Sequence, residues 1–309
     1  KNQEPRPQPN QASFNKFLGS TEAKIVLLSV NLLFATFLTI QFRYFFGGET
    51  NISETGFTYS EYARRGFGEI ITVAVLSLLI YYIFHSITRL ESKNQKRWFS
   101  ALSILIFLQV LIMLVSSYQR LMLYEQAYGF SRLRTYSHLF LPWLALLIIV
   151  VIALEILQRQ GHLAFTILLV AIGFVGTTIA FNIDGFIARQ NIQRANISDR
   201  EGYALDFYYI SELSSDAVPV ILDEYLSNNP STKDLLGANL SCRWYDHQNQ
   251  DKRPFLSFNF SNAQSTKLLA QYQQEWKKYP ISQGESEYQK FVEIDGEPFY
   301  CSLNSMWID

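Results

Sequence analysis

Five long apolar segments constrain this chain more than any other feature of its sequence. They are residues 25–42, 70–87, 99–115, 139–157 and 163–181. Each is nearly free of charged residues and approaches the roughly 20 residues that a helix needs to cross a bilayer. Buried core helices of a soluble protein are the alternative, but five such segments separated by short charged loops favour membrane spans. The sequence therefore predicts an α-helical polytopic membrane protein with about five transmembrane helices in contact with membrane lipids.

The spans divide the chain into three predicted parts. Residues 1–24 form a polar linker that contains three prolines, residues 25–202 form the membrane domain, and residues 203–309 form a soluble C-terminal domain. The linker lacks the order of charged, apolar and small residues that marks a signal peptide. Because the chain begins with Lys1 and not with Met, we expect further residues upstream. The net charge of -1 gives no reason to expect nucleic acid as a partner.

The C-terminal part carries weaker signals that together predict a small α+β domain. Residues 216–226 and 261–278 have helical patterns, and Pro219 fits the first of these helices only within its first turn. Residues 291–301 predict a hairpin that turns at Asp295 and Gly296. We expect this domain to bind a partner or to pack against another subunit.

The orientation of the chain depends on its basic residues and cysteines. Basic residues near the membrane are balanced between the two sides, but the short loop from Arg89 to Arg97 contains four of them and favours a cytoplasmic position for its side. With five alternating spans, the C-terminal domain then lies outside. Both cysteines, Cys242 and Cys301, are in this domain, where a disulfide would fit an oxidising compartment. Two buried free thiols are the alternative.

Three polar segments beside the spans carry the most specific patterns. The segment 47–69 contains a Thr58-x-x-Glu61 capping box, and the helix that starts there is expected to run into the second span. In the segment 120–134, Gly129 and Ser131 suit a helix end and a helix start at a tight corner. The third segment is 182–191. Alternating spans place all three segments at the same membrane surface.

Convergence of these segments predicts one interfacial cluster of arginine, tyrosine and acidic side chains. Its members are Tyr59, Tyr62, Arg64, Arg65, Arg120, Tyr124, Glu125, Arg132, Arg134, Asp184 and Arg189. Guanidinium groups match phosphate geometry and aromatic rings suit the membrane interface, so the cluster fits an anionic lipid or a cell-surface polymer precursor. The alternative is structural, with ion pairs and headgroup anchors that hold three helix ends together.

The same segments resemble a known family. The motifs are Phe46–Gly48, Thr58–Glu69, Arg120–Gly129 with Arg132 and Arg134, Asn182–Asp184 and Ala188–Asn191, Asp216–Pro219 and Ser257–Ser261. They are similar to uncharacterised bacterial multi-spanning membrane proteins grouped under a domain of unknown function. The resemblance covers about residues 25–263 and implies a bacterial inner-membrane protein whose first helices are absent here. It implies no reaction.

Catalytic and metal-binding signatures are not found in the sequence. It contains no His-Glu-x-x-His, Gly-x-Ser-x-Gly, phosphate-binding glycine loop or Cys-x-x-Cys, so we predict no catalytic residues, metal or cofactor. His85 and His138 lie near span ends, where polar anchoring is the simplest interpretation, and Asn31 and Gln109 are expected to form interhelical hydrogen bonds.

The leading hypothesis is a non-enzymatic envelope subunit or scaffold that engages a protein partner. The alternative is an envelope enzyme or transporter for an anionic lipid-linked substrate.

Overall fold

The protein is described by a computed structural model that divides into two compact units. It describes residues 16–46, 59–197, 205–227, 232–249, 259–284 and 289–301, and within its helices the side chains of residues 41–46, 59–67, 69 and 197 are outside this description. The first unit contains Lys1–Tyr128 and Ser137–Val175, and the second contains Gly129–Tyr136 and Gly176–Asp309.

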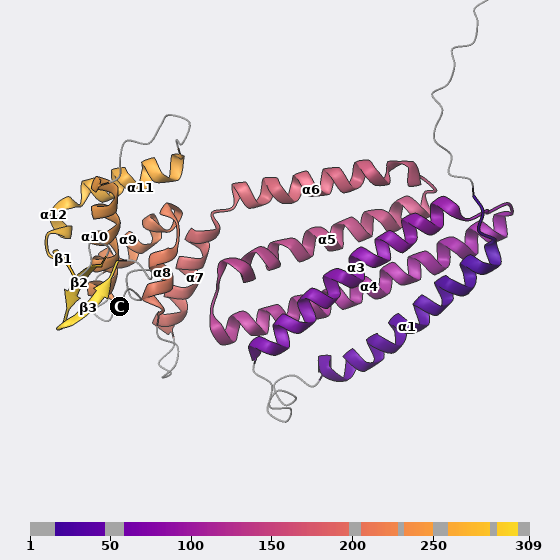
Figure 1. Ribbon diagram of the computed structural model, residues 1–309, viewed down its shortest axis with the longest axis horizontal. Coiled ribbons are helices and arrows are strands. Elements are labelled where there is room, and N and C mark those ends of the chain that lie inside the picture. The colour runs from indigo at the N-terminus through magenta and orange to yellow at the C-terminus, as the bar shows by residue number, and fades with distance from the viewer. Residues whose placement is uncertain are drawn as a thin grey trace, which may run out of the picture. The chain divides into compact units, whose positions relative to one another are not determined.

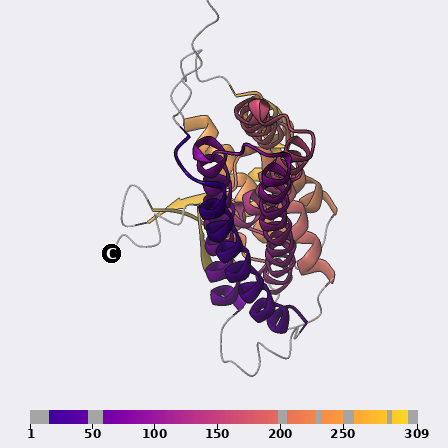
Figure 2. The same ribbon diagram turned by 90° about the vertical axis from the view of Figure 1, so that its right-hand side faces the viewer.

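Long helices build the first unit, and Figures 1 and 2 show them side by side. They are α1 (Ser20–Phe46), α3 (Tyr59–Ile87), α4 (Lys93–Tyr128), α5 (Arg132–Ile156) and α6 (Leu163–Ala180), with the short turn η1 (Gln160–His162) before α6. Among the residues that the structure describes, five helical segments are long and apolar enough to cross a membrane, which confirms the predicted spans. The ends of α5 and α6, at Arg132–Tyr136 and Gly176–Ala180, belong to the second unit.

Helix α4 is the most buried of the long helices and packs against both α1 and α3. Its side chains Phe107, Val110 and Met113 are fully buried, as is Ile148 of α5. Many of the other apolar side chains on these helices are exposed, such as Leu32 and Ile172. Apolar side chains that face outward on such helices are the surface that lipid chains cover.

Two polar side chains inside the bundle confirm the predicted hydrogen bonds between helices. Asn31 Nδ2 donates to the carbonyl of Leu102 at 3.1 Å, and Gln109 Nε2 donates to the carbonyl of Asn31 at 3.3 Å. Both residues are buried. An amide without a partner is costly in hydrocarbon, so these bonds fix how α1 packs on α4.

The start of α4 corrects the predicted loop between the second and third spans. The apolar segment begins at residue 99, but the helix begins at Lys93, so half of the expected loop is helical. A capping box explains this: Gln95 N donates to Ser92 Oγ, while Gln95 Oε1 accepts from the backbone N–H groups of Glu91 and Ser92. Helix α3 is continuous from Tyr59, as predicted, whereas Thr58 lies outside the described residues.

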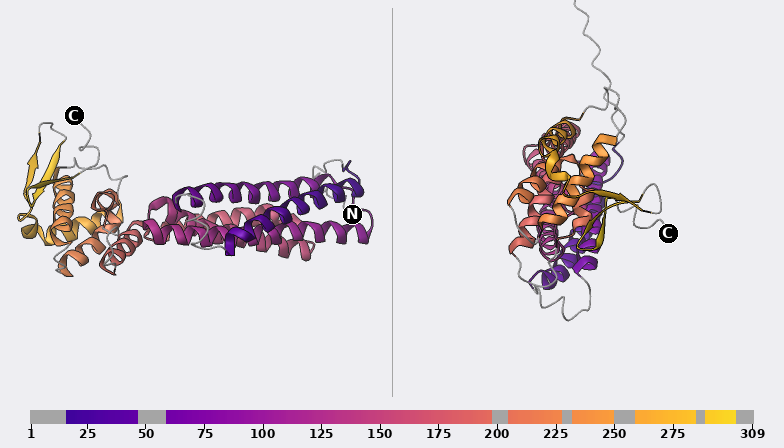
Figure 3. Two further views of the ribbon diagram at one scale, coloured as in Figure 1. Left: turned by 90° about the horizontal axis from the view of Figure 1, so that it is seen from below. Right: turned by 90° about the vertical axis from the view of Figure 1, so that its left-hand side faces the viewer.

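The second unit combines short helices with a small sheet (Figure 3, right). Its helices are α7 (Ile183–Ile197), α8 (Phe207–Glu212), the turn η2 (Ser215–Ala217), α9 (Val218–Ser227), α10 (Lys233–Asn249), α11 (Phe260–Gln271) and α12 (Gln273–Trp276). The strands β1 (Ile281–Gln283), β2 (Lys290–Ile294) and β3 (Glu297–Tyr300) form an antiparallel sheet in the order β1-β2-β3. Ile281 pairs with Val292, and Val292 pairs with Phe299.

The α+β prediction for this part is confirmed. The hairpin turns where predicted, because Asp295 and Gly296 both have positive φ, at 53° and 84°. Pro219 falls in the first turn of α9, as its missing N–H requires. The helix predicted over 261–278 is interrupted at Tyr272, and Trp276 from the short helix beyond folds back to donate to the carbonyl of Leu269 at 2.8 Å.

Candidate functional site

Two of the predicted site residues, Arg132 and Asp184, form a bidentate pair in the second unit. Arg132 Nε donates to Asp184 Oδ1 at 2.9 Å and Nη2 donates to Oδ2 at 2.6 Å. Nη2 also donates to the carbonyl of Glu212 at 2.9 Å, and the N–H of Ser214 donates to Asp184 Oδ2 at 2.7 Å. We call Arg132, Asp184, Glu212 and Ser214 the Arg132–Asp184 junction.

Local sequence explains how the junction forms. Asn182 caps α7, since its Oδ1 accepts from the N–H of Gly185 at 2.7 Å, and this places Asp184 in the first turn of the helix. A carboxylate is favoured there by the helix dipole. Burial raises the pKa of Asp184, but the hydrogen bonds from Arg132 and Ser214 outweigh it and lower the pKa below its ordinary value.

A corner between α4 and α5 adjoins the junction. Gly129 has φ of 76°, as predicted for a helix end, and a Cβ there would lie 2.7 Å from Arg194 Nη1. Asn191 holds the next residue by both backbone groups, accepting from Phe130 N at 2.8 Å and donating to Phe130 O at 2.9 Å. Arg134 Nη1 donates to the carbonyl of Gly129 at 2.6 Å. Side chains from α5 and α7 therefore fix the corner.

These contacts determine what the junction does. Arg132 and Asp184 neutralise each other and join α5 to α7 and to the end of α8, which is a bracing role. The side chain of Arg132 is 45% exposed, whereas that of Asp184 is 9% exposed. The junction therefore favours the structural alternative for these two members of the predicted cluster.

Replacing Asp184 with Ala is expected to lower the free energy of unfolding by about 2 kcal/mol, because it leaves a guanidinium and a backbone N–H without their acceptor. SDS-induced unfolding in detergent micelles measures this. Since the folded pKa of Asp184 is lowered, the difference from wild type is present at neutral pH and disappears as the pH falls through the ordinary value of about 3.9 toward the lower folded value. Asp223→Ala, at an exposed position on α9, is the matched control. Equal stability of both variants would contradict the bracing role.

The other predicted cluster members are distributed over both units. Tyr59, Tyr62, Arg64 and Arg65 lie in the first turns of α3, but their side chains are outside the described residues. Tyr124 in α4 packs against Tyr128, with ring centroids 5.3 Å apart, while Arg120 and Glu125 lie on the same helix in the first unit. Arg189 is exposed on α7 in the second unit. Their binding role stays a prediction.

Sequence reasoning missed the partner of Glu125. His138 Nδ1 lies 2.7 Å from Glu125 Oε2, and the carboxylate side chain is 4% exposed. The simple interpretation of His138 as an interfacial anchor is therefore incomplete, because the ring is paired inside the first unit. A possible signal was the turn at Gly129, which folds α5 back along α4 and so brings positions before and after the corner together.

A second buried carboxylate, Glu155, was also missed. It lies in the last turn of α5, near the end of the predicted span 139–157, and is 1% exposed. Its oxygens accept from Tyr81 Oη at 2.5 Å, from Gln160 Nε2 at 3.1 Å and from Ser100 Oγ. Hydropathy alone cannot find these donors, because Tyr81 and Ser100 come from two other helices. We call these four residues the Glu155 cluster.

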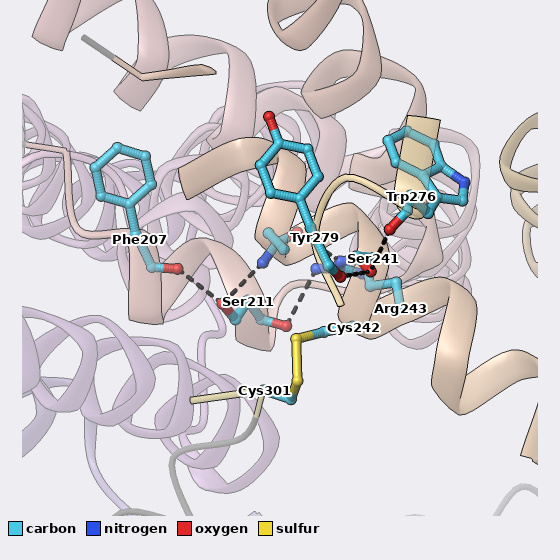
Figure 4. The surroundings of a disulfide bond; sticks show 9 residues. Phe207, Ser211, Ser241, Cys242, Arg243, Trp276, Tyr279 and Cys301 are labelled. Carbon is cyan, nitrogen blue, oxygen red and sulfur yellow. Dashed lines mark hydrogen bonds between the residues drawn. A yellow bond between two sulfur atoms is a disulfide. The ribbon is translucent and has the colours of Figure 1, made fainter. Parts of the chain in front are cut away.

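A disulfide joins Cys242 and Cys301 in the structure. Figure 4 shows it joining α10 to the residue after β3, beside Arg243. Arg243 donates to the carbonyls of Ile210 at 2.9 Å and Leu213 at 2.8 Å, so it satisfies acceptors at the end of α8. Burial lowers the pKa of Arg243 to about 10, which leaves it charged at neutral pH.

Comparison with known families matches residues 1–224 to the family described as Domain of unknown function (DUF4153). The chain belongs to this family. The DUF4153 match includes all five membrane spans and every residue of the Arg132–Asp184 junction, whereas both disulfide cysteines lie beyond it. It ends within α9, earlier than the motif resemblance suggested. No curated protein and no solved structure matches the chain.

Proposed function

We propose that this DUF4153 protein is an integral membrane subunit or scaffold of the bacterial cell envelope that engages a protein partner through its second unit. The Arg132–Asp184 junction carries this proposal, because it braces the start of the membrane helix α5 within a folded, disulfide-linked unit. Exposed apolar side chains in the same unit, Leu226 at 47% and Phe260 at 75%, suit a contact with another protein.

The proposal places the membrane spans in the inner membrane and the second unit on the extracytoplasmic side. The disulfide supports this orientation, because disulfides persist in oxidising compartments. In the proposed topology, five alternating spans put the basic residues Arg89, Lys93, Lys96 and Arg97 on the side opposite to the second unit. Those residues favour a cytoplasmic position for their own side.

A photo-crosslinking residue at Phe260 tests the partner contact. In cells of the native host, we expect it to give one discrete adduct with a protein partner or a second copy, since the ring is 75% exposed on α11. The same crosslinker at Asp223, an exposed polar position on α9, is the control and is expected to give little adduct. No adduct at Phe260, or equal yields at both positions, would contradict the proposal.

The alternative proposal is an enzyme or transporter that acts on an anionic lipid-linked substrate. It is favoured by the buried Glu125–His138 pair, which is the kind of group that intramembrane chemistry uses. Arg132 is a poor probe of this alternative because its loss also breaks the junction. Arg64→Ala and Arg189→Ala are better variants, and retention of anionic lipid by both would remove the alternative.

A further inference from the structure

The Glu125–His138 pair leaves one nitrogen of the imidazole ring for a further partner. His138 Nδ1 lies 2.8 Å from Glu125 Oε1 and 2.7 Å from Oε2. A carboxylate that accepts this hydrogen bond takes it from a ring proton on Nδ1. When the ring is neutral, His138 Nε2 therefore carries a free lone pair.

His138 Nε2 is buried and has no hydrogen-bond partner. The other buried side-chain atoms without a partner, among the residues that the structure describes, are all hydroxyl or amide oxygens. A hydroxyl can turn toward a different acceptor and an amide oxygen has a second lone pair, but a ring nitrogen has one fixed direction. An orphaned buried nitrogen in a native structure requires an explanation, and a ligand that donates to it is one.

The position of the pair indicates which ligands can reach it. His138 is six residues after the start of α5 at Arg132, and Glu125 is three residues before the end of α4 at Tyr128. At 1.5 Å per residue these positions lie about 9 Å and 5 Å from the helix ends, where headgroups meet hydrocarbon. The ring of Tyr118 packs edge to face on His138 at 4.6 Å and is itself 38% exposed. The contact of His138 with this exposed ring places the pair close to the lipid-facing surface of the bundle.

We propose that Glu125 and His138 form a binding site for a hydroxyl-bearing lipid headgroup, whose O–H donates to His138 Nε2. Glu125 holds the ring in the tautomer that accepts this hydrogen bond, as carboxylates do for catalytic histidines. A metal ion is the other ligand that a carboxylate-paired histidine takes. The described residues contain no group of three or more His, Cys, Asp or Glu that could hold one, so the geometry favours a hydrogen-bond donor. The site does not depend on the protein partner proposed above.

The nitrogen resonances of the full-length wild-type protein test this site without any variant. Protein labelled with ¹⁵N-histidine is placed in phosphatidylcholine nanodiscs, and one compound is added at a time. Neutral glucosyl diacylglycerol supplies sugar hydroxyls, phosphatidic acid supplies charge without a headgroup alcohol, and methyl glucoside supplies soluble hydroxyls. We expect only glucosyl diacylglycerol to shift the Nε2 resonance of His138. No shift with this lipid, or an equal shift with either other compound, would overturn the proposal.

Variants give an independent measurement. In native mass spectrometry, Glu125→Gln and His138→Phe are each expected to retain about fivefold less glucosyl diacylglycerol than wild type, the ratio that one net hydrogen bond supplies. His162→Phe, which replaces an exposed histidine in η1, is the matched control and is expected to retain as much as wild type. Equal retention by His138→Phe and His162→Phe would overturn the proposal. If Glu125→Gln or His138→Phe fails to fold, the shift of the His138 Nε2 resonance in the wild-type protein still tests the proposal.

Discussion

Replacing both Cys242 and Cys301 with Ser is expected to lower the free energy of unfolding of the second unit by about 4 kcal/mol, because the disulfide closes a long loop. The two residues are 59 positions apart in the chain, and an open loop of this length gains much conformational entropy on unfolding. Loss of the bond also frees the end of β3 from α10. Chemical unfolding followed by tryptophan fluorescence measures the change, because Trp276 lies in the core of this unit.

Reduction of the wild-type protein is the matched control for the cysteine substitutions. Dithiothreitol is expected to destabilise wild type by a similar amount and to leave the double Ser variant unchanged. If the double variant unfolds at the same denaturant concentration as oxidised wild type, the bond does not stabilise the unit. If the double Ser variant is less stable but reduced wild type is not, packing around the sulfur atoms stabilises the unit and the bond itself does not.

Glu155→Ala is expected to lower the free energy of unfolding of the membrane bundle by about 3 kcal/mol, because it leaves one buried and two partly buried donors without this acceptor. Tyr81 Oη, Ser100 Oγ and Gln160 Nε2 all donate to this carboxylate. They come from α3, α4 and η1, so the Glu155 cluster joins three segments to the end of α5. SDS-induced unfolding of the purified protein measures the change.

Two further variants test whether the hydrogen bonds of the Glu155 cluster stabilise the membrane bundle. Tyr81→Phe removes one donor and leaves the carboxylate with the others, so we expect a loss of about 1 kcal/mol. Glu91→Ala, at an exposed position before α4, is the control and is expected to have almost no effect. A Glu155→Ala variant as stable as Glu91→Ala would show that the buried carboxylate contributes nothing to the bundle.

Much of the fold could be predicted from local sequence. The five spans follow from hydropathy, the corner from Gly129 and the hairpin from Asp295 and Gly296, since each needs only neighbouring residues. The start of α4 was within reach too, because Ser92 and Gln95 have the spacing of a capping box. Helix α10 was not predicted, because its sequence is polar on average and its buried stretch from Leu236 to Cys242 lacks helical periodicity.

The candidate site was predicted less well, for a physical reason. The sequence placed Arg132 and Asp184 in one cluster but left open whether they bind a ligand or form ion pairs, and the structure pairs them with each other. Charge type and membrane side can be inferred from sequence, whereas the choice between an internal partner and an external ligand depends on a few ångströms of packing. His138 and Glu155 show the same limit, because their partners are set by contacts between helices.

Native mass spectrometry of the protein, extracted gently from its own membrane, tests the proposed function most directly. A subunit or scaffold is expected to retain a protein partner in fixed stoichiometry, and to lose it when Phe260 on the second unit is replaced with Glu. The Asp223→Ala variant is expected to keep the partner. Recovery of the wild-type chain only as a free monomer, or with bound lipid alone, would contradict the proposed role.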